Sequence, residues 1–264
     1  MTHPTESLHI PDTQSERDHR RLAIQRVGVK DLRYPLALRV AGAVQTTAAL
    51  WALDVALPAD KKGTHMSRLV AWLDEGTAVV LDAATLRERH AAMLARLGAD
   101  EGRVEAAFSF FLRKRAPVSG LASLLDYQGR WIAETRGGRT AVWAEVGVPV
   151  KSLCPCSKEI SDYGAHNQRA LVTIRAELLA PVEWHELVRF AEDQASSEIW
   201  PMLKRTDEKW VTERAYENPK FVEDLVRDVA LGINGDARIG RYSVDVENIE
   251  SIHNHSAYAR IERA

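Results

Sequence analysis

Residues 131–150 read WIAETRGGRTAVWAEVGVPV, and this stretch decides the fold class. Apolar and polar residues alternate on both sides of Gly137-Gly138, which is the pattern of two antiparallel strands joined by a tight turn. We therefore predict a β-hairpin over 131–143 and a further strand over 145–150.

Strand and helix patterns continue upstream of this hairpin. Residues 27–57 are rich in Val, Leu, Ala and Thr, and predict two strands with a turn near Ala41-Gly42. Thr64 suits the N-cap of a helix whose apolar face includes Met66 and Leu73. A second helix is predicted over 83–97, and strands over about 103–115 and 120–134.

A similar order of elements follows downstream. The patterns predict a strand over 169–179, a helix over 181–199, a helix capped by Asn218-Pro219 and strands over about 239–248 and 255–263. Each half therefore has strands, two helices and strands. We predict an α+β fold with antiparallel sheets, made of two modules (about 26–140 and 141–264) behind a flexible arm over 1–25.

Composition narrows the classes of function. The chain has 264 residues, of which 45% are hydrophobic, so it can bury a sizeable core. Lys plus Arg (35) against Asp plus Glu (37) argues against non-specific nucleic-acid binding, which needs a basic excess. No apolar run approaches the ~18 residues of a membrane span, and the N-terminus lacks the apolar core of a secretory signal. Two cysteines separated only by Pro155 suit a reducing compartment. We expect a globular cytoplasmic protein without a nucleic-acid or membrane partner.

Side chains capable of chemistry are densest in SLCPCSKEISDYGAHNQR, residues 152–169, between two predicted strands. Cys154 could serve there as a nucleophile, a redox thiol or a metal ligand, and Lys158 would favour its thiolate. Two cysteines are too few for a structural zinc cage. A small buried apolar residue is an equally good interpretation of each cysteine. His166 follows in the same loop, where it is either a hydrogen-bonded loop residue or a ligand.

Two further segments carry charged or imidazole groups. In ESIHNH, residues 250–255, His253 and His255 would point to one side of an extended chain, with Glu250 close enough to join them. In KRTDEKWVTE, residues 204–213, the mixed charges are typical of a solvated loop, but also suit a carboxylate ligand beside phosphate-binding cations.

Glu223 is predicted in the first turns of a helix. An acid there stabilises the helix dipole. If buried, it could instead bind a heterocycle with two N–H donors, such as the N1/N2 edge of guanine. The sequence contains no Walker A, GxGxxG, HExxH or GxSxG motif, so a nucleotide site would need another architecture.

The segments SLCPCSKEISDYGAHNQR, KRTDEKWVTERAYENPKFVEDLVRD and IESIHNHSAYA together resemble the prokaryotic type IB GTP cyclohydrolase I family. The resemblance extends from about Val27 to Ile261. It implies two tunnelling-fold modules in each chain, assembled into a barrel-like homotetramer with sites at subunit interfaces. It also implies a metal-dependent hydrolase that converts GTP and water to 7,8-dihydroneopterin triphosphate and formate, the first step of folate biosynthesis.

The same resemblance implies roles for individual residues. Cys154 would be the catalytically important cysteine and a metal ligand, and His166 would bind the metal or move protons beside it. The implied remaining ligands or acid/base groups are Glu208, Glu250, His253 and His255, with His255 ranked below Glu250 and His253 as a ligand. Glu223 would hold the guanine edge, and the candidates for the triphosphate are Lys204, Arg205, His65 and Arg68, which could also be solvated surface charges. A thiolate with imidazole suits Zn²⁺, and added carboxylates admit Mn²⁺ or Fe²⁺.

Three alternatives stay open at this point. Another tunnelling-fold enzyme, such as a nitrile reductase, would use a cysteine nucleophile and NADPH. A thiol redox protein would use the Cys154–Cys156 pair. A metal- or pterin-binding module would bind GTP without releasing formate. Each alternative accounts for one motif, whereas the cyclohydrolase interpretation accounts for three.

Overall fold

The computed structural model describes residues 12–264. Nine strands in this range form one sheet, in the order β3-β1-β2-β4-β5-β6-β7-β8-β9. The strands are β1 Ile24–Val40, β2 Ala43–Leu57, β3 Val80–Leu81, β4 Gly102–Arg115, β5 Ala122–Arg136, β6 Arg139–Leu153, β7 Asn167–Leu178, β8 Ile239–Asn248 and β9 Ala257–Arg263. The helices are η1 Thr13–Ser15, α1 Met66–Asp74, α2 Ala83–Leu97, α3 Pro155–Ile160, α4 Trp184–Glu192, α5 Arg205–Glu217 and α6 Val222–Asn234.

The predicted hairpin at the centre of the sequence also lies at the centre of the sheet. Gly137 and Gly138 both adopt positive φ (55° and 74°), which glycine tolerates without steric cost. The turn places β5 antiparallel to β6, from Gln128 opposite Gly147 to Arg136 opposite Arg139. This pair joins the first half of the sheet to the second, so the two halves of the chain share one sheet.

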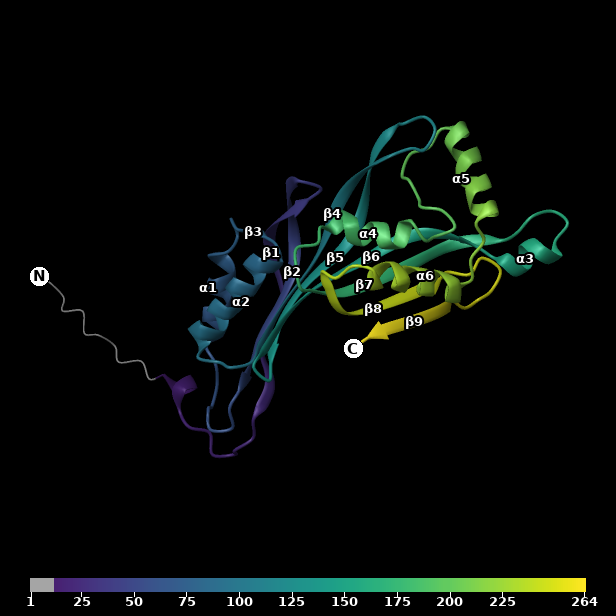
Figure 1. The fold of residues 1–264 in the computed structure, drawn as a ribbon. Coiled ribbons are helices and arrows are strands. Elements are labelled where there is room, and N and C mark those ends of the chain that lie inside the picture. Colours follow the sequence, from purple (N-terminus) through teal and green to yellow (C-terminus); the bar gives the residue numbers. More distant parts are fainter. Residues whose placement is uncertain (1–11) are drawn as a thin grey trace, which may run out of the picture.

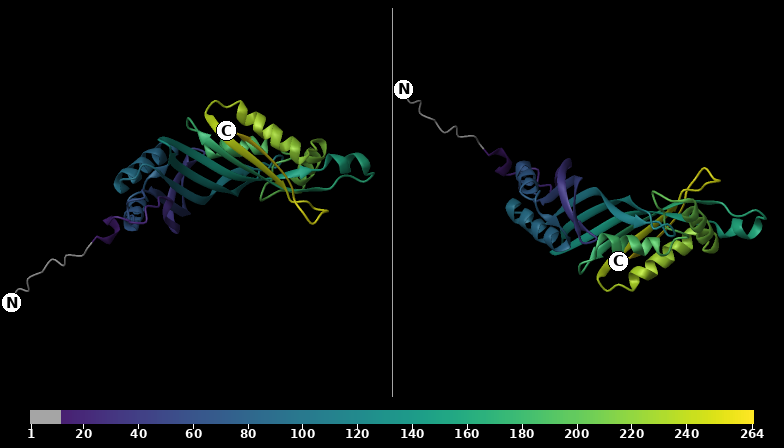
Figure 2. Two further views of the ribbon diagram at one scale, coloured as in Figure 1. Left: turned by 90° about the horizontal axis from the view of Figure 1, so that it is seen from below. Right: turned by 90° about the horizontal axis from the view of Figure 1, so that it is seen from above.

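Four helices cover one face of the sheet. Figures 1 and 2 show α1 and α2 over the first half and α4 and α6 over the second. Alternate residues of each strand face these helices, as in β4, where Val104, Ala106 and Phe110 are fully buried. Trp184 of α4 packs edge-on against Trp131 of β5, with ring centroids 4.9 Å apart. The core is therefore a single apolar layer between helices and sheet.

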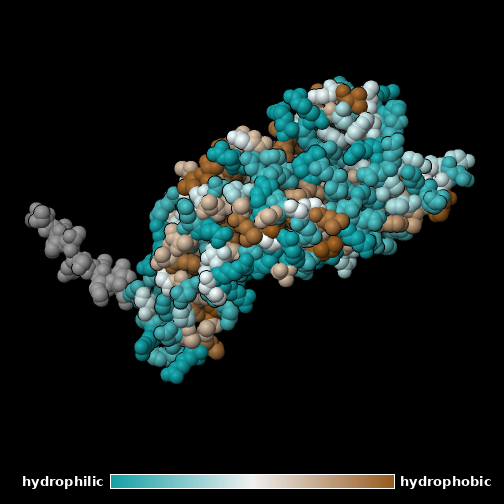
Figure 3. Space-filling view, in the orientation of Figure 1, coloured by the Kyte–Doolittle hydropathy of each residue, from teal (hydrophilic) through white to brown (hydrophobic). Residues whose placement is uncertain are grey.

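The opposite face of the sheet is polar. Here Arg130 lies 3.1 Å from Glu105 and 3.5 Å from Glu145, so ion pairs link β4, β5 and β6. Further along, Glu177 of β7 pairs with Arg241 of β8 at 2.8 Å. Figure 3 has the orientation of Figure 1 and views the side that carries the helices, where apolar residues lie in small patches among polar ones. No helix within residues 12–264 is long and apolar enough to cross a bilayer.

Several elements differ from the sequence-based predictions. Residues 140–153 form one continuous strand rather than two, and only 184–192 of the predicted 181–199 helix are helical. The charged segment beginning at Lys204 is a helix, not a loop, because Val211 and Ala215 give it a buried side and Asp207 binds the amide of Lys204. The following helix starts at Val222, with Phe221 as its N-cap rather than Asn218.

Only part of the predicted N-terminal arm, residues 1–25, belongs to the described residues. Residues 1–11 lie outside the described residues. Residues from Asp12 onward contact the 58–64 connection, where Gln14 donates to the carbonyl of Thr64 and Lys62 donates its amide to Glu16. The strand β1 then begins at Ile24, slightly earlier than the predicted Val27.

Candidate active site

The cysteine motif forms a loop that is closed at its base by hydrogen bonds. Cys154 directly follows β6 and is the N-cap of α3, with Pro155 in the first turn and the Ser157 amide donating to Cys154 Sγ at 3.5 Å. The Cys154 amide donates to the His166 carbonyl at 3.1 Å. Ser157 Oγ donates to the Cys154 carbonyl and accepts from the His166 amide, each at 3.1 Å. The two ends of the loop are thereby tied together, so Cys154 and His166 lie beside each other.

A buried carboxylate lies next to this loop. The amide of Ile249 donates to the carbonyl of Arg169, which brings the end of β8 to the start of β7. Glu250 follows directly, and its Oε2 lies 3.9 Å from His166 Nδ1. The Glu250 side chain is 11% exposed, and Oε2 is buried without a hydrogen-bond partner within residues 12–264. An unpaired buried carboxylate oxygen is costly, and a bound cation would relieve that cost.

Gln168 orients the imidazole of His166. Its Oε1 lies 3.0 Å from His166 Nδ1 and accepts a hydrogen bond from it. This contact leaves the lone pair on Nε2 free for a metal ion, which is the usual arrangement of a metal-binding histidine and its hydrogen-bonded neighbour. Gln168 is not among the site residues predicted from the sequence, although its position two residues after His166 is that of a neighbour on the same side of an extended chain.

The donor types around the loop fit a divalent metal. A thiolate, an imidazole and a carboxylate are ligands of Zn²⁺, and the carboxylate also suits Mn²⁺ or Fe²⁺. Over residues 12–264, however, no three His, Cys, Asp or Glu side chains approach closely enough to hold a metal by themselves. Cys154, His166 and Glu250 therefore do not form a three-ligand cluster in the described part of the chain.

The other predicted ligands lie at the surface. His253 and His255 stand in the exposed loop between β8 and β9, with their rings stacked 5.0 Å apart. Glu208 is exposed in the first turn of α5, beside a surface hollow that Arg205 also lines. Within the described part of the chain, no hydrogen bond or ion pair joins these side chains to Cys154 or His166.

The predicted guanine-binding acid lies near the cysteine loop in the fold. Glu223 is an exposed residue of the first turn of α6. The amide of Lys220 donates to the carbonyl of Leu153 at 3.1 Å, and Ser152 Oγ donates to the carbonyl of Lys220. These contacts attach the start of α6 to the end of β6, one residue before Cys154.

The predicted triphosphate residues fall into two places. Lys204 and Arg205 begin α5, in the second half of the chain. His65 and Arg68 begin α1 and line a cavity of about 210 Å³ in the first half, where His65 Nε2 lies 3.6 Å from Asp12 Oδ2. Figure 1 shows α1 and α5 on opposite sides of the molecule, so a single chain does not bring these two groups together.

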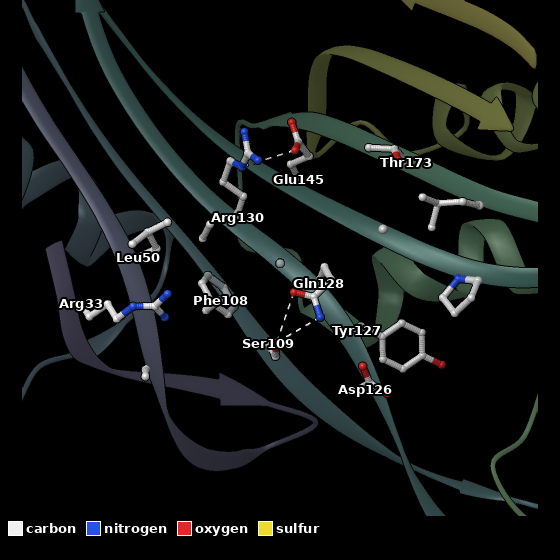
Figure 4. A pocket seen from close by; sticks show the side chains of 16 residues that line it. Arg33, Leu50, Phe108, Ser109, Asp126, Tyr127, Gln128, Arg130, Glu145 and Thr173 are labelled. Carbon is white, nitrogen blue, oxygen red and sulfur yellow. Dashed lines mark hydrogen bonds and ion pairs between the residues drawn. The ribbon is translucent and has the colours of Figure 1, made fainter. Parts of the chain in front are cut away.

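A larger cavity lies elsewhere. It has a volume of about 640 Å³ and lies on the helix-free face of the sheet, between β1 and β7. Figure 4 shows Arg130 paired with Glu145 on one side of this cavity and Ser109 bonded to Gln128 on another. None of the residues predicted for the active site lines it.

Comparison with known proteins shows the family. A family model described as type I GTP cyclohydrolase folE2 matches residues 10–259. The chain belongs to the FolE2 family. A GTP cyclohydrolase FolE2 of Methylibium petroleiphilum is 63% identical over 296 residues, covering all of both chains. One from Paraburkholderia xenovorans is 60% identical over 255 residues, covering 96% of this chain and 95% of the relative. The family resemblance read from the three motifs is thereby confirmed at the level of FolE2.

Solved structures confirm the fold class. Uricase from Arthrobacter globiformis superposes with a TM-score of 0.50 at 11% identity, covering 90% of this chain and 93% of the uricase. A hyper-thermostable AgUricase mutant reaches 0.53 at 9% identity, covering 92% and 93%. At such low identity the likeness concerns the fold alone, and it identifies this FolE2-family chain as an α+β protein of the tunnelling fold.

Proposed function

We propose that this FolE2-family chain is a cytoplasmic type IB enzyme that converts GTP and water to 7,8-dihydroneopterin triphosphate and formate, the first step of folate biosynthesis. Family membership supports the substrate and the reaction. The observation that carries the proposal is the loop that holds Cys154 and His166 together beside the buried Glu250 side chain, whose Oε2 has no hydrogen-bond partner within residues 12–264.

The reaction needs attack of water at C8 of guanine, opening of the imidazole ring and hydrolysis of the formyl group. Cys154, His166 and Glu250 would hold a divalent ion, with Glu208 and His253 as further candidate ligands. When bound, such an ion supplies polarisation of water near neutral pH. Gln168 keeps His166 in the tautomer that can donate its Nε2 lone pair.

The later rearrangement and ring closure are proton transfers. Imidazoles are suited to them because their unperturbed pKa lies near neutrality. His255 is the proposed acid/base group, since it stands in the exposed β8–β9 loop that begins at Glu250. This role requires the loop to close over the substrate, which the exposed position of His255 permits.

We propose further that the sites are completed between subunits of a barrel-like homotetramer. Residues 12–264 bring no three possible metal ligands together, and His65 and Arg68, at the start of α1, lie at the far end of the molecule from the Cys154 loop; a second subunit could supply what one chain does not. The sheet also ends in β9, an edge strand with an exposed Tyr258 that a second copy could cover. In such an assembly, His65 and Arg68 of one subunit would bind the triphosphate at the Cys154 loop of another.

Turnover of GTP by the purified protein tests the proposed function. Formate should be released together with a product that becomes a fluorescent pterin on oxidation, in equal amounts. The matched reaction with ATP should release neither. If no formate or pterin forms from GTP with any added metal, and NADPH is consumed with a nitrile substrate instead, the reductase interpretation of Cys154 replaces this one.

Replacing Glu223 by glutamine should weaken GTP binding without removing the metal. The carboxylate would accept two N–H donors of guanine, and hydrogen bonds to a charged group contribute about 1.5–3 kcal/mol, so affinity should fall roughly 10- to 100-fold. GTP affinity and metal content would be measured together. Glu88→Gln, on the exposed side of α2, is the matched control and should bind GTP normally. Wild-type affinity in Glu223→Gln would refute the assignment.

A further inference from the structure

The first turn of α5 carries a buried acid between residues that the proposed function uses. Lys204, Arg205 and Glu208 are exposed, but Asp207 has no accessible surface. A carboxylate that is fully buried at this position costs desolvation energy unless donors surround it. Its partners therefore show what the residue does.

The Asp207 carboxylate joins two distant segments. Oδ1 accepts hydrogen bonds from the amides of Val118 and Ser119, each at 2.8 Å. Oδ2 accepts from Ser119 Oγ at 2.7 Å and from the amide of Lys204 at 2.8 Å. Val118 and Ser119 lie at the tip of the β4–β5 hairpin, and Figure 1 shows this tip beside the start of α5. Three donors of the hairpin tip thus hold the start of α5, and the fourth donor, the Lys204 amide, belongs to the N-cap of α5 itself.

These contacts also set the charge of Asp207. Burial by itself raises the pKa of the carboxyl group, but the hydrogen bonds from Ser119, Lys204 and Val118 outweigh it and hold the pKa well below its usual range. Asp207 therefore stays ionised at neutral pH, as an acceptor for all four donors.

A second set of contacts holds the chain that leads into α5. Lys114 of β4 lies 2.6 Å from both Glu192 and Glu198, and it is nearly buried. Trp200 donates its Nε1 hydrogen to the carbonyl of Arg115 at 2.9 Å. The 193–204 connection is therefore attached along the hairpin strands. Asp207 is the residue that attaches the first turn of α5 itself.

We propose that Asp207 is a positioning residue, which docks the first turn of α5 on the hairpin tip and so directs Lys204, Arg205 and Glu208 toward the triphosphate and the metal. This inference rests on the proposed function of those three residues. The docking of α5 by Asp207 does not depend on the reaction, because the same four hydrogen bonds hold the start of α5 whatever ligand the helix binds.

Asp207→Asn tests the role. The amide nitrogen is a donor, so it opposes the backbone and hydroxyl donors that the carboxylate accepts. We expect the KM for GTP to rise roughly 10- to 100-fold, with a smaller change in kcat, and metal retention after dialysis to fall. Hydrogen exchange should increase at residues 116–121 and 204–209. Ser119→Ala, which removes one donor of the four, should move the same quantities in the same direction by a smaller factor.

Asp82→Asn is the matched control. Asp82 caps α2 by accepting from the amide and hydroxyl of Thr85 at 2.8 and 2.6 Å, and it belongs to the first half of the sheet. The Asp82→Asn variant should lose a similar capping contact, without a change in the KM for GTP or in metal retention. If folded Asp207→Asn matches this control in KM, metal retention and hydrogen exchange, the positioning role is wrong. If the wild-type protein makes no pterin, the proposed function fails instead, and the exchange at 204–209 still reports whether Asp207 holds α5.

Discussion

Cys154→Ala is expected to abolish the release of formate from GTP, lowering kcat/KM by at least about 10³-fold. The thiol is the softest ligand of the proposed set, and no other cysteine can replace it, since Cys156 is exposed on α3. The fold should survive, because within residues 12–264 Cys154 Sγ accepts a single hydrogen bond, a 3.5 Å contact from the Ser157 amide. Steady-state kinetics, metal content and the mass of the assembly would be measured on the same preparation.

Cys156→Ala separates the cyclohydrolase from a thiol redox protein. If Cys154 works alone, the Cys156 variant should keep most of its activity, whereas a redox pair would lose function equally in both variants. Cys154→Ser provides a second test that preserves the cap of α3. Substantial formate release by either Cys154 variant would remove the cysteine from the proposed machinery.

Chelation is expected to have the second large effect. Removing the divalent ion should lower turnover by at least about 10²-fold, because the water attack at C8 then lacks its source of polarisation. Added Mn²⁺, Zn²⁺ or Fe²⁺ should restore it. Ca²⁺ and Mg²⁺ should not, since they prefer all-oxygen ligands over a site with thiolate and imidazole.

The chelation experiment has its own structural readout. No donor within residues 12–264 reaches the buried Oε2 of Glu250, so metal-free protein should bind one ion per site with release of protons, measured by calorimetry in buffers of different ionisation enthalpy. Glu250→Gln should weaken that binding, while Glu88→Gln should not. Full turnover by protein shown to be free of metal would contradict the proposal.

Local patterns were sufficient for most of the strands and for the family. The 131–150 alternation around Gly137-Gly138 corresponds to the observed hairpin, and the predicted turn at Ala41-Gly42 corresponds to the β1–β2 turn. Both succeed because a strand with one buried face must alternate and a tight turn needs positive φ. The motif containing Cys154 and His166 is also local, since both residues belong to one loop.

Local patterns failed where a distant contact decides the conformation. The charges from Lys204 to Glu213 are typical of a solvated loop, yet the segment is helical because Asp207 binds the hairpin tip, 88 and 89 residues away in the chain. The predicted helix over 181–199 stops at Glu192, where the chain turns to follow Lys114 and the hairpin. The residue pattern within 204–213 or within 181–199 does not indicate these contacts with the β4–β5 hairpin.

The sequence by itself determined the antiparallel α+β class, the central hairpin and the membership of the FolE2 family, because these depend on residue order over short windows. Only the tertiary structure showed that Glu250 lies beside His166 with an unpaired oxygen, and that His65 and Arg68 lie far from Cys154. The distances between these residues depend on which strands pair and on how the helices dock on the sheet. Long-range packing determines both the pairing and the docking. The physical reason is that burial and hydrogen bonding act through space, whereas the patterns in the sequence record only neighbours along the chain.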